Sequence, residues 1–255
     1  MYRTSIDSLL LNQVNKVYTT NQYSSSIYSS SSNQNYLKFV RDNFLNEIIN
    51  KDYATITQSS NVLFNIYNGS KYLITDKEPL IGYKEIAKEN NLILYENKNV
   101  LPIGYASSNI MSLREFNTLP YPNNIDALLN YIIVNKSLDD IYKSNINSIY
   151  PKITITKYNN LDYALKDNNY LYINSLDGGY FNLNLNEIIN NKILIIQFKM
   201  NKEKNGTVCS TDITINNITN SLSCSNWKYH NKNYTFEYVI SKDKPFSNLD
   251  VYFTK

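Results

Sequence analysis

Few residues of this chain could carry out chemistry. The single histidine, His230, stands in a polar segment before a predicted strand, and we expect it in a surface turn rather than as a catalytic base. One histidine and two cysteines cannot build a multi-histidine metal centre or a zinc cluster. The six glycines form no nucleophile elbow, no P-loop and no dinucleotide-binding fingerprint. We therefore expect no catalytic residue, no metal and no cofactor in this chain.

The two cysteines, Cys209 and Cys224, flank a predicted strand at residues 212–218. On neighbouring antiparallel strands they would lie within reach of a disulfide. The alternative, which we favour, is a pair of buried thiols. Both interpretations stay open.

Aromatic residues offer a different chemistry. Trp227, Tyr229 and Tyr234 lie close together in a polar stretch of the second half. Aromatic ring faces stack on the apolar faces of sugar rings, so these three are candidate carbohydrate-binding residues. The alternative is that Trp227 covers the core or a sheet edge, because large aromatic residues are mostly buried.

The first half contributes three further candidates: Arg3, Tyr28 and Asn33. Arginine is scarce in this sequence, and its guanidinium group suits the phosphate of an anionic polymer. The alternative for Arg3 is a position in a frayed terminus.

Composition excludes several classes of protein. A net charge of +3 over 255 residues is too weak to predict a nucleic-acid partner. No apolar run approaches the ~20 residues of a membrane span, and the N-terminus lacks the basic and apolar regions of a signal peptide. The abundance of tyrosine, with 24 residues, and of asparagine is typical of a chain from an A/T-rich genome.

The secondary structure predicted for the chain changes near Tyr150, from mixed helices and strands to strands alone. Before it, apolar spacing predicts helices at residues 37–49, 83–90, 112–116 and 124–133, and strands at 71–75, 92–95 and 100–105. Ser112 and Glu115 have the spacing of a capping box.

After Tyr150, short extended segments follow one another. We predict strands at 152–158, 170–173, 180–185, 193–200, 212–218, 234–240 and 249–253. Phe181, Leu183 and Leu185 alternate with asparagines, which is typical of a strand with one buried and one solvated face. The expected fold is α+β, with a mixed α/β domain at 1–149 followed by an antiparallel, jelly-roll-like β-sandwich at 150–255.

Several segments resemble the extracytoplasmic region of the YfhO family of bacterial multi-pass membrane proteins. The most specific are a KYLI strand at 71–74 and a YEN…LPxGY element at 94–105. Weaker similarities are Tyr2-Arg3, the Ser-rich stretch at 21–32, Phe39 in the first helix, the helix at 124–134, and the segments 221–227 and 236–240.

The resemblance implies a C-type glycosyltransferase-like parent that decorates cell-wall polymers, such as teichoic acids, with sugars from a polyprenyl-phosphate donor. The family's catalytic carboxylates lie in loops of a membrane domain that this chain lacks, so none carries over. The chain then resembles a soluble piece on the extracytoplasmic face of the bacterial membrane, with its own membrane domain and a cell-wall polymer or glycan as partners. The Ser-rich stretch becomes an ordered loop near the first helix.

Three hypotheses for function follow. The first is an accessory module of such a glycosyltransferase, which binds the acceptor polymer or supports the membrane domain. The second is a stand-alone carbohydrate-binding or adhesin-like surface protein. The third is a hydrolase with paired carboxylates, because such pairs form in space and not in sequence.

Overall fold

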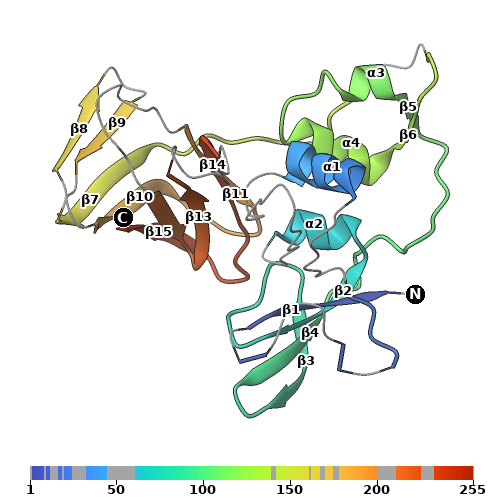
Figure 1. Cartoon of the computed structure of the whole chain (residues 1–255), viewed down its shortest axis with the longest axis horizontal. Helices are drawn as coiled ribbons and strands as arrows, with labels where there is room; N and C mark the ends of the chain where they lie inside the picture. Colours follow the sequence, from blue (N-terminus) through green and yellow to red (C-terminus); the bar gives the residue numbers. More distant parts are fainter. Residues whose placement is uncertain are drawn as a thin grey trace. The chain divides into compact units, whose positions relative to one another are not determined.

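The computed structural model describes residues 2–8, 10–11, 17–18, 20–24, 33–44, 61–138, 142–160, 162–166, 170–174, 178–199, 211–224 and 233–254. Strands predominate over helices and form several sheets, so the fold is α+β (Figure 1). The described residues divide into two compact units, one up to Ile149 and one from Tyr150 onward. The sequence pattern changes at the same position.

The first unit contains a four-stranded sheet in the order β1-β2-β4-β3. Its strands are β1 (Arg3–Asp7), β2 (Ser70–Thr75), β3 (Lys84–Glu89) and β4 (Leu92–Glu96). The β1 and β2 strands are parallel, so the chain between them must cross over, and it contains helices α1 (Gln34–Phe44) and α2 (Val62–Tyr67). The other two pairs of strands are antiparallel.

The two helices of this crossover pack through aromatic rings. Phe44 contacts Phe64 edge-on, with ring centroids 5.2 Å apart, and Tyr67 at 5.4 Å. Phe39 lies 6.0 Å from Phe44. Such offset and edge-on contacts are the favoured geometries of aromatic pairs. The predicted helix at 37–49 is confirmed as far as Phe44, and residues 45–49 lie outside the described residues.

A second part of this unit consists of β5 (Ile110–Ser112), α3 (Leu113–Phe116), α4 (Asn123–Asn130) and β6 (Ile132–Val134), with β5 parallel to β6. The predicted cap is confirmed in one half, because Ser112 Oγ accepts from the N–H of Glu115 at 3.1 Å. The Glu115 carboxylate instead accepts from the N–H of Tyr142 at 2.6 Å. The helix predicted at 124–133 forms but ends earlier, because Tyr131 is extended.

Two predictions in the first unit are wrong. Residues 83–90 form strand β3 instead of a helix, because Asn90 adopts a left-handed conformation (φ 52°) and the tight turn there pairs β3 with β4. Residues 100–105 form a loop instead of a strand, because Pro102 and Gly104 interrupt the apolar run.

The second unit is built from strands, and the seven predicted segments coincide with strands there. They are β7 (Ile153–Asn159), β9 (Tyr170–Asn174), β10 (Gly179–Ile189), β11 (Leu194–Lys199), β12 (Thr211–Ile215), β14 (Thr235–Ile240) and β15 (Phe246–Thr254), and β8 (Asp162–Lys166) and β13 (Ile218–Leu222) are additional. The segment predicted at 212–218 turns at Asn216 and Asn217, both with positive φ, so it divides between β12 and β13.

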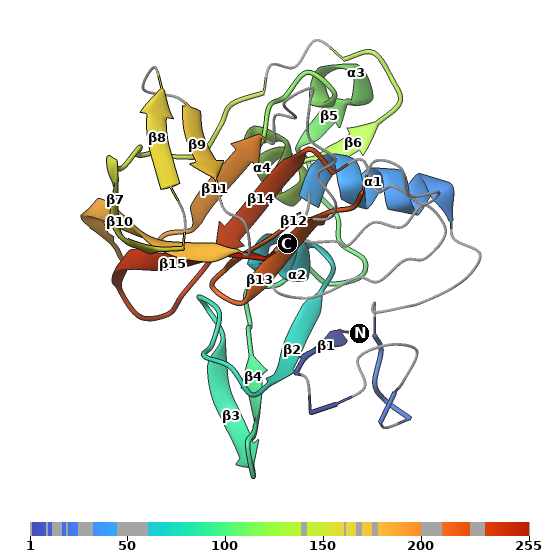
Figure 2. The ribbon, with the colours of Figure 1, turned by 60° about the vertical axis from the view of Figure 1, so that its left-hand side comes forward.

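These strands form a five-stranded sheet in the order β13-β12-β15-β10-β7 and two antiparallel pairs, β11-β14 and β8-β9. Figure 2 shows β11 and β14 lying on one side of the five-stranded sheet. Alternate residues of both sheets share one buried core: Phe181, Leu183, Leu185, Ile189, Leu194, Ile196, Ile213, Ile215, Ile218, Leu222, Phe236, Tyr238, Ile240, Leu249 and Val251. The predicted inward face of 181–185 is thereby confirmed.

Candidate functional site

The best candidate site is the side of the five-stranded sheet that faces away from this core, which we call the outer face. Side chains alternate between the two sides of a strand, so the polar residues between the core residues point outward. The outer face comprises Thr154, Thr156, Tyr180, Asn182, Asn184, Asp212, Thr214, Thr219, Asn248, Asp250 and Tyr252.

A hydrogen-bonded row crosses three strands of this face. Thr156 on β7 lies opposite Asn182 on β10, which lies opposite Asp250 on β15. The Thr156 hydroxyl donates to Asn182 Oδ1 at 3.2 Å, and Asn182 Nδ2 donates to Asp250 Oδ1 at 2.9 Å. These bonds orient the Asn182 amide, and Asp250 itself is exposed. We call these three residues the amide row.

Two tyrosines lie beside the amide row. Tyr180 and Tyr252 are cross-strand neighbours with ring centroids 6.0 Å apart and planes inclined at 34°. Tyr252 is 50% exposed. Next to Tyr252, Thr214 on β12 hydrogen-bonds through its hydroxyl to Thr219 on β13 at 2.8 Å. The tyrosine pair therefore offers an aromatic surface within a row of hydroxyl groups.

Local sequence explains why the strands approach closely here. Gly178 has φ +87°, and a Cβ at this position would lie 2.5 Å from the carbonyl oxygen of Phe253. A Cβ at Gly179 would lie 2.6 Å from the carbonyl oxygen of Asn159. Only glycine permits these close backbone contacts with β15 and β7. The two glycines therefore place the start of β10 immediately before Tyr180.

The outer face carries negative charge. Asp212 and Asp250 belong to it, and the lysine of β7, Lys157, is exposed and follows Thr156 at a shift in register. Within the described part of the chain, neither carboxylate forms an ion pair; the two ion pairs found there, Lys71–Glu96 at 3.1 Å and Lys77–Asp7 at 2.7 Å, belong to the first unit.

The predicted residues of the first unit have local structural contacts. Arg3 is half-buried in β1, where its Nη1 donates to the carbonyl oxygen of Asn68 and its backbone N–H donates to that of Gly69 at 2.8 Å. Arg3 is therefore held in a sheet, and the frayed-terminus alternative is wrong. Asn33 precedes α1 and caps its N-terminus, because its Oδ1 accepts from the N–H groups of Asn35 and Tyr36 at 3.0 and 3.1 Å.

Of the predicted aromatic residues of the second unit, Tyr234 is the one that the structure describes, and it does not belong to the outer face. Tyr234 precedes β14 and is 40% exposed. Trp227, Tyr229 and Tyr28 lie outside the described residues, as do His230, Cys209 and the Ser-rich stretch from 25 onward. The roles predicted for these residues stay predictions, and so does the choice between disulfide and thiols.

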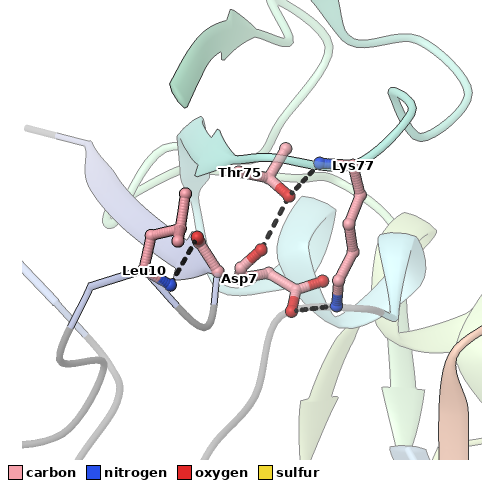
Figure 3. A network of polar contacts seen from close by, with 5 residues as sticks. Asp7, Leu10, Thr75 and Lys77 are labelled. Carbon is pink, nitrogen blue, oxygen red and sulfur yellow. Dashed lines mark hydrogen bonds and ion pairs between the residues drawn. The ribbon is translucent and has the colours of Figure 1, made fainter. Parts of the chain in front are cut away.

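A polar cluster at the ends of β1 and β2 is the main competing candidate (Figure 3). Lys77 pairs with Asp7, and the Thr75 hydroxyl donates to the backbone carbonyl of Asp7 at 2.6 Å. The carboxyl ends of parallel strands are common ligand sites. Here, however, the polar groups bind one another and join the two strand ends, which is a structural role.

The alternation of asparagines in β10 was the signal that could have revealed the outer face. Sequence reasoning used it only to assign a solvated side. The partners of Asn182 are distant in the chain, since Thr156 and Asp250 are separated by more than ninety positions. Their meeting depends on strand order, which no local pattern contains.

Comparisons with known proteins add no assignment. A scan against protein-family models, a search of curated proteins and a search of solved structures each found no match. Among the described residues, no three His, Cys, Asp or Glu side chains are grouped so that they could hold a metal ion. In the same residues, no helix is long and apolar enough to cross a membrane.

Proposed function

We propose that this chain is a non-catalytic carbohydrate-binding module that binds a glycan on the outer face of its five-stranded sheet. The observation that carries the proposal is the Tyr180–Tyr252 pair, in which Tyr252 is exposed and Tyr180 half-buried, next to the hydrogen-bonded row of Thr156, Asn182 and Asp250. A sugar ring presents apolar C–H groups on its faces and hydroxyl groups around its edge. The tyrosine pair suits the first, and the amide row suits the second.

Preorganisation supports this choice of ligand. The Asn182 amide already donates to Asp250 and accepts from Thr156, so little side-chain freedom is lost when a hydroxyl group binds beside it. Tyrosine supplies a large and rigid contact area at a small cost in conformational entropy. Both features favour weak but oriented binding of a flexible polymer.

The finer architecture of the second unit is part of the proposal. We assign it as a β-sandwich of the jelly-roll type, in which the β11–β14 pair covers the inner side of the five-stranded sheet. The shared core of both sheets supports this assignment. In such a sandwich the uncovered side of the larger sheet is free for a ligand.

The resemblance to the YfhO family suggests where such a module would act. In that setting it would be the extracytoplasmic accessory module of a membrane glycosyltransferase, and the face would bind sugar residues of the cell wall rather than the phosphate groups of an anionic polymer. A stand-alone surface protein would use the same face. The two differ in whether membrane spans adjoin this chain in the full reading frame.

The experiment is a binding screen with the purified chain against insoluble cell-wall polysaccharides and soluble hexasaccharides, followed by calorimetry. We expect Tyr252→Ala to weaken binding of the best ligand about tenfold or more, as loss of a stacking ring does. The matched control is Tyr150→Ala, which removes an 89% exposed tyrosine that is not part of the face. Absence of binding to every glycan, or equal losses in the two variants, would reject the proposed function.

A further inference from the structure

We propose that the outer face selects an amine-bearing sugar, such as a 2-amino-2-deoxy sugar with a protonated amino group, over neutral and anionic sugars. This inference rests on the proposed glycan-binding function and adds the chemical class of the ligand. Three features of the face support it: its carboxylates, its aromatic pair and the placement of the two relative to each other.

Among the described residues, no lysine or arginine pairs with the carboxylates of the face. Asp250 receives a hydrogen bond from a neutral amide, Asn182 Nδ2, and no ion pair involving Asp250 or Asp212 occurs among the described residues. In the first unit, by contrast, Asp7 and Glu96 each have a lysine within 3.1 Å. The outer face therefore presents carboxylate charge for which a cationic ligand group is the complement.

The tyrosine pair lies between the two carboxylates. In the register of the sheet, Asp250 is two residues before Tyr252 on β15, and Asp212 is two residues before Thr214, the cross-strand neighbour of Tyr252. One carboxylate therefore lies on each side of the aromatic row. Tyrosine rings attract a cation over their faces, and carboxylates attract it at the edges.

Anionic polymers fit this face poorly. A phosphate or uronic acid group that approaches the tyrosine pair would meet the two carboxylates of the face, which repel it. A ring with one protonated amine keeps the stacking surface and the hydroxyl groups of a neutral sugar. It adds an attraction to Asp250 that a neutral sugar lacks.

The test is calorimetry of the full chain with three hexasaccharides: a β-1,4-glucosamine hexamer, its N-acetylated form and a β-1,4-glucose hexamer. At pH 5.5 and low salt we expect the glucosamine hexamer to bind about tenfold more tightly than either neutral hexamer, from one exposed ion pair and one cation–π contact. Adding 0.5 M NaCl, or raising the pH until the sugar amine is neutral, should remove most of this preference.

The variant Asp250→Asn tests the assigned residue. An amide oxygen still accepts from Asn182, so the row keeps its geometry while the charge is lost. We expect the preference for the glucosamine hexamer to fall to about threefold or less. Asp243→Asn is the matched control, because Asp243 is exposed on the turn between β14 and β15, and it should keep the full preference.

The outcomes separate the two proposals. Binding of the N-acetylated or glucose hexamer as tight as that of the glucosamine hexamer would overturn the amine selectivity and leave carbohydrate binding standing. An unchanged preference in Asp250→Asn would also overturn it. Binding of a polyglycerol-phosphate polymer in preference to all three hexamers would reject the charge argument. Failure of every glycan to bind would reject the proposed function itself.

Discussion

Glu237 on β14 is the buried carboxyl whose ionisation we expect to control the stability of the second unit. Its side chain is 1% exposed. Gln197 Nε2 donates to one carboxylate oxygen at 3.3 Å, and the other oxygen has no hydrogen-bond partner in the described structure. Burial raises the pKa of Glu237 from 4.5 to about 7, and the Gln197 hydrogen bond opposes this only in part.

The raised pKa makes the free energy of unfolding depend on pH. The folded state holds the proton more tightly than the unfolded state, so the stabilisation is complete below pH 4.5 and is lost as the pH rises to about 7. At about 1.4 kcal/mol for each pH unit, the loss reaches about 3 kcal/mol above pH 7. Glu237→Gln removes the ionisation and keeps an oxygen that can accept from Gln197.

The assay is urea unfolding of the parent and of Glu237→Gln at pH 4.5, 6 and 8, monitored by tyrosine fluorescence. We expect similar stabilities at pH 4.5, and at pH 8 a variant more stable than the parent by up to about 3 kcal/mol. The control is Glu187→Gln, because Glu187 is an exposed residue of β10. A parent whose stability is constant or increases from pH 4.5 to 8 would refute the reasoning.

Two further substitutions test the local structure. Asn61→Ala should destabilise the first unit by about 1–2 kcal/mol in urea unfolding. The Asn61 side chain accepts from two N–H groups in the first turn of α2, and its Nδ2 donates to the carbonyl oxygen of Phe44 at 3.3 Å. A loss of stability no larger than that of Asn33→Ala, which removes an exposed cap, would contradict this. Gly178→Ala should lower the free energy of unfolding by about 1–3 kcal/mol, because Gly178 has a positive φ and the carbonyl oxygen of Phe253 lies close to it. In the control Gly104→Ala, the added Cβ has nothing within 4 Å, so thermal melting should be nearly unchanged.

Local patterns predicted the elements whose stability is local. The cap at Ser112 depends on residues three positions apart, and the alternation of Phe181, Leu183 and Leu185 depends on one strand. The helix predicted at 83–90 is wrong because all six residues of β3 are exposed. No apolar face therefore distinguishes a strand from a helix in this segment. What decides their conformation is pairing with β4 across a turn at Asn90, and asparagine was counted as compositional background.

The candidate site was harder to predict because its chemistry is shared among strands. Asn182 alone is an ordinary surface amide, and it becomes an oriented group only when strand order places Thr156 and Asp250 on its two sides. Aromatic residues close together in sequence, such as Trp227 and Tyr229, gave a stronger signal than Tyr180 and Tyr252, which are 72 positions apart. In a sheet, cross-strand neighbours and not chain neighbours share a surface, so a ligand-binding face on this fold is defined by register. A sequence search for such a face must therefore begin from strand pairing and then ask which outward residues meet.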